Sequence, residues 1–271
     1  MRKDGKISYI FYLTEYCNLA CKYCYQGEKK QERFMSPEVG LSRLNDVMKI
    51  EHDPFIVLFG GEPLLNWKTL IAILDKANEY RNLGKKIRIS LVTNATLLSL
   101  EKLRKLFEYS SFLNLEISID GSKRTHNECR IDKRGNGTFD AVYNNAKRAL
   151  LYFPFSYARI VVVDINSYKD NVLFLKEMGF RCFRLQGLHG NFNEKHIVDN
   201  KYQKYFYKIT IELINIIQQT PFSQVIYYPL EKKDNNGRKM KDKHIYFKTD
   251  GDIIIQDAII KKRWDHFLKR P

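Results

Sequence analysis

The stretch TEYCNLACKYCYQ, residues 14–26, places Cys17, Cys21 and Cys24 on one short loop. The loop directly follows KISYIFYLT, residues 6–14, whose alternation of apolar and polar residues predicts a β-strand. A structural zinc site takes four ligands, and neither a partner C-x2-C pair nor a suitably spaced histidine pair follows in this chain. A 4Fe-4S cluster held by three thiolates keeps one iron open to another ligand. The spacing therefore favours an iron-sulfur cluster with an open coordination position.

The overall composition agrees with thiols that stay free. The chain has 271 residues with a hydrophobic content of 44%, which is enough for one large domain with a closed core. Its five cysteines are odd in number and unevenly spread, so a secreted disulfide framework is not expected. No apolar run approaches the roughly 18 residues of a membrane span, and the first residues contain no small-residue cleavage site. We expect a soluble, cytoplasmic protein.

The net charge of +15 comes from 46 Lys and Arg against 31 Asp and Glu. Such a balance would suit an acidic partner, including nucleic acid. The basic residues are spread along the whole chain, however, and do not gather in one stripe. The dense runs lie near the C-terminus, where solvated charge is ordinary. We therefore do not expect nucleic-acid binding.

Short apolar or alternating runs are separated by amphipathic stretches along most of the chain. The predicted strands are residues 6–14, 55–59, 86–93, 112–119, 157–163 and 182–188, and the predicted helices between them are 36–50, 67–83, 99–109, 138–153 and 167–179. Strands that alternate with helices imply right-handed crossovers and a parallel sheet. The sequence predicts an α/β fold, an open (β/α)6 partial TIM-type barrel.

The last part of the chain predicts a short α/β extension. Residues 200–220 have the pattern of a further helix, and residues 244–256 that of a hairpin turning at Asp250 and Gly251. We expect a core barrel over residues 1–190 and the extension over residues 191–271.

In α/β barrels the loops after the strands converge at one end of the sheet, where function is located. The loop after residues 55–59 contains Gly60, Gly61, Glu62 and Pro63. Adjacent glycines let backbone approach a ligand closely, the carboxylate can accept from an ammonium group, and the proline stiffens the turn. An ordinary strand-to-helix turn explains the glycines and proline but not the glutamate.

Polar side chains also end the third and fourth predicted strands. Asn94, Ser118 and Asp120 stand where they could meet a ribose or a carboxylate. Asn, Ser and Asp are equally common in turns and helix caps, so each residue alone is compatible with either role.

Four motifs in order resemble those of the radical S-adenosylmethionine (radical SAM) enzymes. CNLACKYC resembles their C-x3-C-x-aromatic-C motif, with Tyr23 at the aromatic position, and FGGEPLLN resembles their GGEP motif. VTNATLL is similar to their TNGTLL segment, with Ala95 where glycine is common. SIDGSKRTHNECR resembles a segment of the branch that includes anaerobic sulfatase-maturating enzymes and maturases of ribosomally made peptides. The resemblance covers about residues 6–188 and is more specific than any single motif.

The resemblance implies two cofactors and a set of residues for them. Cys17, Cys21 and Cys24 would hold one 4Fe-4S cluster, whose open iron chelates S-adenosylmethionine (SAM). The GGEP residues would hold the methionyl amine of SAM, and further cofactor contacts are expected from Tyr23, Asn94, Ser118, Asp120 and Arg130. The implied reaction is reductive cleavage of SAM to a 5'-deoxyadenosyl radical, which abstracts hydrogen from the substrate. An external electron donor such as flavodoxin or ferredoxin is implied as well.

The branch resemblance makes a peptide or protein the expected substrate. Relatives of this branch usually carry a C-terminal extension of seven cysteines for auxiliary clusters. No cysteine follows Cys182 here, and Gln256 stands where the second cysteine of that extension would fall. We therefore expect a single cluster and a degenerate or truncated extension. A catalytically inactive peptide-binding partner and an anaerobic sulfatase maturase stay as alternatives.

Two cysteines lie outside the first loop. Cys129 falls on a predicted polar loop and has no assigned role. Along residues 182–188, strand alternation sends Cys182, Arg184 and Gln186 to one face, which in a barrel faces the interior. Cys182 is thus a candidate hydrogen donor to a substrate radical, although free cysteine is among the residue types that are most often simply buried.

Overall fold

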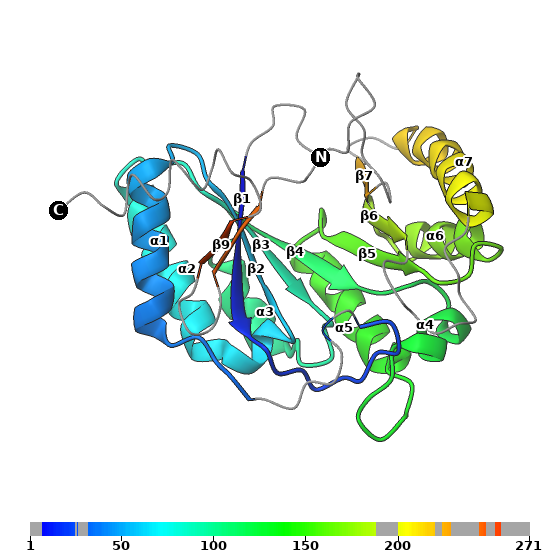
Figure 1. Ribbon diagram of the computed structural model, residues 1–271, viewed down its shortest axis with the longest axis horizontal. Helices are drawn as coiled ribbons and strands as arrows, with labels where there is room; N and C mark the ends of the chain where they lie inside the picture. The colour runs from blue at the N-terminus through cyan, green and yellow to red at the C-terminus, as the bar shows by residue number, and fades with distance from the viewer. Residues whose placement is uncertain are drawn as a thin grey trace.

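The computed structural model describes residues 7–24, 26, 32–187, 200–219, 224–228, 244–247 and 253–255. Its strands form one sheet in the order β7-β6-β5-β4-β3-β2-β1-β8-β9 (Figure 1). The strands are β1 Ser8–Thr14, β2 Phe55–Gly60, β3 Arg88–Thr93, β4 Leu113–Ser118, β5 Tyr157–Val162, β6 Cys182–Gly187, β7 Gln224–Tyr228, β8 His244–Phe247 and β9 Ile253–Ile255.

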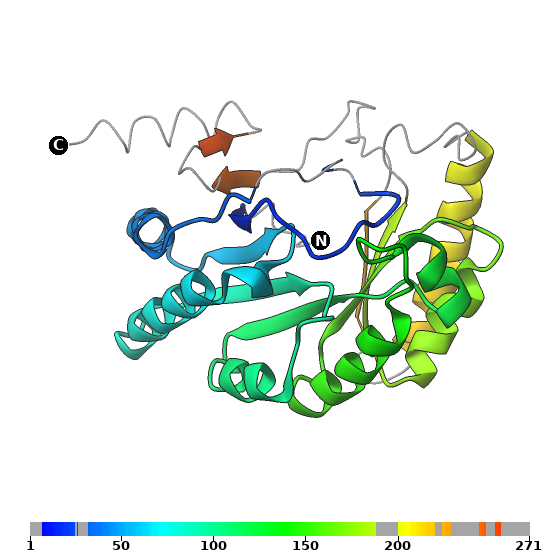
Figure 2. The ribbon, with the colours of Figure 1, turned by 90° about the horizontal axis from the view of Figure 1, so that it is seen from below.

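Strands β1 to β6 are neighbours in chain order and pair in parallel, and each is joined to the next by helices. The helices are α1 Pro37–Ile50, η1 Pro63–Asn66, α2 Trp67–Asn82, α3 Leu100–Phe107, α4 Lys123–Cys129, α5 Phe139–Tyr152, α6 Tyr168–Glu177 and α7 Asn200–Gln218. Figure 2 shows α1 to α6 along one side of the curved sheet. This arrangement confirms the predicted open α/β barrel.

The core lies between the sheet and these helices. Alternate residues of each strand are buried in it, as with Leu115 and Ile117 of β4, while the residues between them face the other side of the sheet. We call that other side the inner face.

Local signals explain where several helices begin and end. The Ser36 hydroxyl accepts from the Val39 backbone N–H at 3.3 Å, and Pro37 takes the first position of α1. Gly179, just after α6, has a φ of +115°, a conformation that side chains strongly disfavour. Patterns of this kind locate the helices from sequence.

Three features were not predicted. Helix α4 occupies part of the segment that we expected to be a polar loop, and β7 adds a parallel strand beside β6. Strand β8 pairs in parallel with β1 and antiparallel with β9, so the expected hairpin strands extend the main sheet. Asp250, Gly251 and Gln256 lie outside the described residues, and the division of the chain near residue 190 stays a prediction.

Among the described residues, no helix combines the length and apolar character required to cross a membrane.

Candidate functional site

The cysteine loop begins where β1 ends and is anchored to the last residue of α4 and to the segment that follows it. The Ala20 backbone N–H donates to the Ile131 carbonyl at 2.8 Å, and the Lys22 N–H donates to the Cys129 carbonyl at 2.9 Å. Cys129 therefore contributes to the site through its backbone, and burial raises the pKa of its thiol to about 11, so the thiol stays protonated near neutral pH.

The three loop thiols lie close enough to interact. Cys17 is buried, while Cys21 and Cys24 are partly exposed, and none of the three forms a disulfide. Burial raises the pKa of Cys21, the Arg130 guanidinium opposes that effect, and neighbouring Cys17 and Cys24 raise the pKa further. Within the described parts of the chain, no group of histidine, cysteine and acidic side chains closes around a single metal ion. Three cysteines on one loop are the ligand set that a 4Fe-4S cluster with one open iron requires.

The two glycines of the GGEP loop let it pack directly against the cysteine loop. A Cβ atom on Gly60 would lie 2.3 Å from the Thr14 carbonyl oxygen, and one on Gly61 would lie 2.0 Å from the Tyr16 carbonyl oxygen. The Gly61 and Glu62 N–H groups donate to these same carbonyls at 2.8 and 2.9 Å. In the structure the glycines thus allow contact between two loops, and their expected contact with a ligand stays a prediction.

Glu62 joins the loop after β2 to the end of β3. Its Oε1 accepts from the Thr93 hydroxyl at 2.7 Å and from the Leu64 N–H at 3.0 Å, and its Oε2 accepts from the Asn94 N–H at 2.7 Å. The side chain is fully buried, and burial raises its pKa although these hydrogen bonds oppose the shift. Pro63 is the first residue of the short helix η1. Binding of the SAM amine by Glu62 stays a prediction.

Asn94 joins the loop after β3 to the cysteine loop. Its side-chain nitrogen donates to the Asn18 side-chain oxygen at 3.0 Å and lies 3.7 Å from the Cys17 sulfur. Ala95 follows with a φ of +59°, in the left-handed region that favours glycine. This backbone explains why glycine suits that position in the resembling motif.

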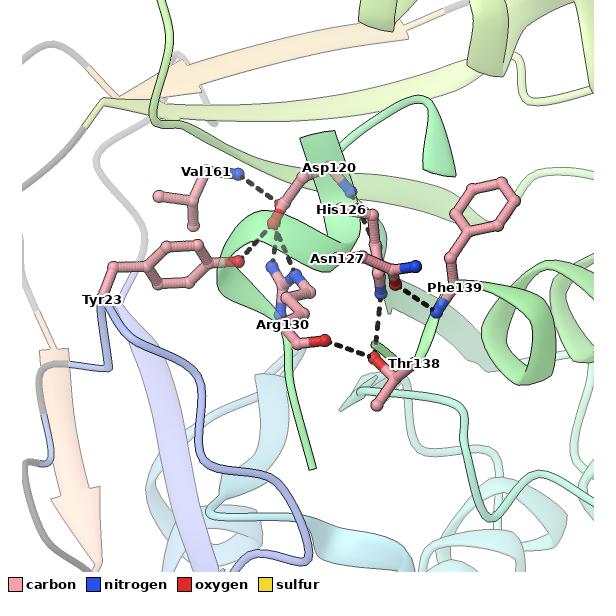
Figure 3. A network of polar contacts seen from close by, with 8 residues as sticks. All are labelled: Tyr23, Asp120, His126, Asn127, Arg130, Thr138, Phe139 and Val161. Carbon is pink, nitrogen blue, oxygen red and sulfur yellow. Dashed lines mark hydrogen bonds and ion pairs between the residues drawn. The ribbon is translucent and has the colours of Figure 1, made fainter. Parts of the chain in front are cut away.

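Asp120, just after β4, is the centre of a buried polar network (Figure 3). It forms a two-pronged ion pair with Arg130, through Nε at 2.8 Å and Nη2 at 3.0 Å, and accepts from the Val161 N–H at 3.0 Å. The Tyr23 hydroxyl also donates to Asp120, and the Arg130 guanidinium lies 5.2 Å from the centre of the Tyr23 ring. The network therefore fixes the cysteine loop to β4, α4 and β5.

His126 of α4 lies next to this network and is buried. Its Nδ1 accepts from the Asp120 N–H at 3.4 Å, its Nε2 lies 3.1 Å from the Thr138 hydroxyl, and that hydroxyl donates to the Arg130 carbonyl. Burial lowers the pKa of His126 to about 4, so the ring is neutral at neutral pH. The sequence pattern offered no indication of these partners.

Ser118 and Cys182 lie at opposite ends of their strands. Ser118 ends β4, beside the loops described above, and is buried. Cys182 begins β6, so about 16 Å of strand separates it from the carboxyl end of the sheet. It is 2% exposed, and burial raises the pKa of its thiol. This position favours a packing role for Cys182.

The structure thus brings together all of the residues that were expected to hold the cluster or SAM. The loop residues that gather at the carboxyl ends of β1 to β4 are Cys17, Cys21, Tyr23, Cys24, Gly60, Gly61, Glu62, Pro63, Asn94, Ser118, Asp120 and Arg130. Their contacts with a cofactor stay predictions.

Comparison with known proteins identifies the family. A family model described as the radical SAM superfamily matches residues 11–178, more than half of the chain. The cysteine-type anaerobic sulfatase-maturating enzyme of Clostridium novyi is 30% identical over 183 residues, which cover 61% of this chain and 46% of that protein. The radical SAM cyclopropyl synthase TigE of Paramaledivibacter caminithermalis is 33% identical over 130 residues, or 41% of this chain and 26% of that protein.

Solved structures share the fold. The native anSMEcpe structure with bound AdoMet has a TM-score of 0.68 at 23% identity. The match covers 81% of this chain and 64% of the anSMEcpe chain. Streptococcus suis SuiB bound to the precursor peptide SuiA has a TM-score of 0.71 at 14% identity. That match covers 97% of this chain and 65% of the SuiB chain. The chain spans less than half the length of the curated relatives named above. From the family match over residues 11–178, the chain belongs to the radical SAM superfamily.

Proposed function

We propose that this chain is an enzyme that cleaves SAM reductively and uses the resulting radical to take a hydrogen atom from a peptide. The observation that carries the proposal is the joining of four loops at one end of the sheet. Glu62 links the loops after β2 and β3, Asn94 reaches the cysteine loop, and Asp120 holds that loop through Tyr23. A preorganised site of this kind is what radical chemistry on an unactivated carbon requires.

The thiolates of Cys17, Cys21 and Cys24 would hold one 4Fe-4S cluster, which leaves one iron for the amine and carboxylate of SAM. When bound, and reduced by an external donor such as flavodoxin or ferredoxin, this cluster would supply the electron for reductive cleavage of SAM. Hydrogen transfer from the substrate would then give 5'-deoxyadenosine.

The protein contributes position and exclusion of water. Buried Asn94 would set the place of Cys17, and the Asp120–Arg130 pair would keep Tyr23 against the cysteine loop. Ser118 and Glu62 would offer oxygen atoms to the polar groups of SAM. Because these groups are fixed before SAM arrives, little reorganisation is needed on binding.

Two kinds of relative support a peptide substrate. Sulfatase-maturating enzymes are among the curated relatives, and one structural neighbour was solved with a precursor peptide.

The test uses a peptide encoded beside this gene, labelled with deuterium on its carbon atoms. Anaerobic reconstituted protein, SAM and a strong reductant should give 5'-deoxyadenosine that is heavier by one mass unit, because the radical takes deuterium from the peptide. Unlabelled deoxyadenosine with every neighbouring peptide would contradict the peptide substrate.

A further inference from the structure

A second polar cluster lies on the inner face of the sheet, on the strands that follow the SAM motifs. Glu116 of β4, Arg159 of β5 and Arg184 of β6 each stand between residues that belong to the core on the helix side. Strand alternation therefore turns all three side chains to the inner face. These core neighbours are Leu115, Ile117, Ala158, Ile160, Phe183 and Leu185.

Both arginines bind the same carboxylate. Arg184 Nη2 lies 2.8 Å from Glu116 Oε1, and Arg159 Nη1 lies 3.1 Å from Glu116 Oε2. The Ser90 hydroxyl donates to Glu116 Oε1 at 2.8 Å, and Arg159 Nη2 donates to the Gln186 side-chain oxygen at 3.1 Å. We call these five residues the inner cluster.

The inner cluster holds two positive charges against one negative charge. Burial acts to raise the pKa of Glu116, but Arg184, Arg159 and the Ser90 hydroxyl outweigh it and hold the pKa below its usual range, so Glu116 is ionised. The side chains of Glu116 and Arg184 are 2% and 10% exposed. The two guanidinium groups share this carboxylate, and each contacts a different one of its oxygen atoms. By contrast, Asp120 and Arg130 balance each other.

Arg159 is the accessible member of the inner cluster. Its side chain is 21% exposed, and its contacts with Glu116 and Gln186 use two of the five N–H donors of a guanidinium group. The guanidinium also lies 5.8 Å from the centre of the Phe59 ring of β2. Arg159 is therefore held in one place by three neighbours, yet retains donors in the fork geometry that matches a carboxylate.

The register of β4, β5 and β6 places the two arginines next to the expected SAM site. Arg159 is the Cα partner of Ser118 in the β4–β5 pair, and Arg184 is the Cα partner of Arg159 in the β5–β6 pair. Strand spacing puts the two arginines about 5 and 10 Å along the sheet from Ser118. Because the SAM motifs follow β1 to β4, strands β5 and β6 continue the inner face beyond them.

We propose that Arg159 and Arg184 form a subsite for a carboxylate group of the peptide substrate. The carboxylate belongs to an acidic side chain or to the C-terminus of the peptide, and Glu116 orients the two guanidinium groups that receive it. Only the statement that the ligand is a peptide rests on the proposed function. The subsite selects substrates that present a negative charge beside the reacting residue.

The test measures binding of small capped probes to the full, reconstituted chain by calorimetry or NMR. The probes are the α-amide of N-acetylglutamic acid, the matching glutamine compound, and N-acetylalanine, which represents a C-terminal carboxylate. We expect one of the two carboxylate probes to bind about tenfold or more tightly than the glutamine probe, as for a charge-assisted hydrogen bond. Tighter binding of the glutamate probe would identify an acidic side chain as the ligand, and tighter binding of N-acetylalanine would identify the C-terminus of the peptide.

The variant Arg159→Gln should lose that preference and keep its affinity for SAM. Arg148→Gln is the matched control, because Arg148 is an exposed arginine of α5 that hydrogen-bonds to Asn144 and Asn145. It should bind every probe as the parent does. Equal binding of the glutamate and glutamine probes to the parent protein would overturn the proposal. A loss of SAM affinity in Arg159→Gln would overturn it too, by assigning Arg159 to the cofactor.

If Arg159→Gln does not fold, as judged by circular dichroism, the parent protein still allows a test. Phenylglyoxal modifies accessible arginines, and mass spectrometry locates the modified residues. The carboxylate probe, but not the glutamine probe, should protect Arg159, and equal modification with both would overturn the proposal. The proposed function is tested by a different result. A protein that binds the carboxylate probe but releases no 5'-deoxyadenosine would contradict the proposed function and would leave the carboxylate subsite in place.

Discussion

Glu62 illustrates how one buried side chain holds two ends of the site. It accepts hydrogen bonds from Leu64, Thr93 and Asn94, so the loops after β2 and β3 share one carboxylate. A role in binding the SAM amine would therefore be added to a structural role. The GGEP motif predicted an important acid at this position, but not these three partners, because they depend on how two separate loops meet.

We predict that Glu62→Gln lowers both stability and SAM affinity. Glutamine offers one acceptor oxygen, so its NH₂ group would face a buried N–H donor. The expected loss is about 1–3 kcal/mol in the free energy of unfolding, measured with urea. SAM binding, measured by calorimetry on the reconstituted protein, should weaken as well. Glu177→Gln, at an exposed glutamate that ends α6, is the control and should change stability by less than about 0.5 kcal/mol. Unchanged stability in Glu62→Gln would contradict the structural role.

A second prediction concerns His126 and acid. Its pKa is about 4 in the folded chain and 6.5 ordinarily, so between these values the unfolded chain binds the extra proton. Stability is therefore lost as pH falls from 6.5 to about 4, by about 3 kcal/mol from this residue alone. His126→Gln should be less stable at pH 7 but should lose less stability on acidification. Urea unfolding of both proteins at pH 6.5 and 4.5 measures this difference, and parallel losses would contradict the account.

At the level of elements, the site depends on backbone contacts between loops. Gly61 is the clearest case, because a Cβ atom there would meet a backbone carbonyl that has little freedom to move. We predict that Gly61→Ala displaces the cysteine loop and lowers the iron content after reconstitution well below the roughly four atoms per chain of the parent.

Gly40→Ala in α1 is the matched control. The added Cβ would lie 3.0 Å from the flexible end of the Ile73 side chain, and alanine favours a helix. Iron analysis and protein determination on the same samples should show the parent ratio for this variant. A full iron content in Gly61→Ala would mean that the two loops need not touch.

The regular elements of the barrel could be predicted because their hydrophobic periods are strong. The five main crossover helices agree with the structure to within about two residues at each end. Helix α4 has the sequence KRTHNEC, which has no apolar period, so its local pattern resembled a loop. The parallel partner of β1 could not be foreseen either, because β8 follows β1 by more than 200 residues. The inner cluster likewise depends on the register of four strands, β3 to β6.

For the whole molecule, the open sheet supplies two different regions at one end. The loops after β1 to β4 carry the cysteine and SAM motifs, while β5 and β6 present the two arginines of the inner cluster. A parallel sheet places these regions side by side although they are far apart in sequence. The account therefore assigns cofactor and substrate to neighbouring parts of one sheet.

The central claim is that the three thiols of the cysteine loop support cleavage of SAM. The most direct measurement is 5'-deoxyadenosine released by anaerobically reconstituted protein with SAM and a strong reductant, without any substrate. The account predicts steady release by the parent protein, and none above background from a variant in which Cys17, Cys21 and Cys24 are all alanine. Release from the parent no faster than from that variant would contradict it.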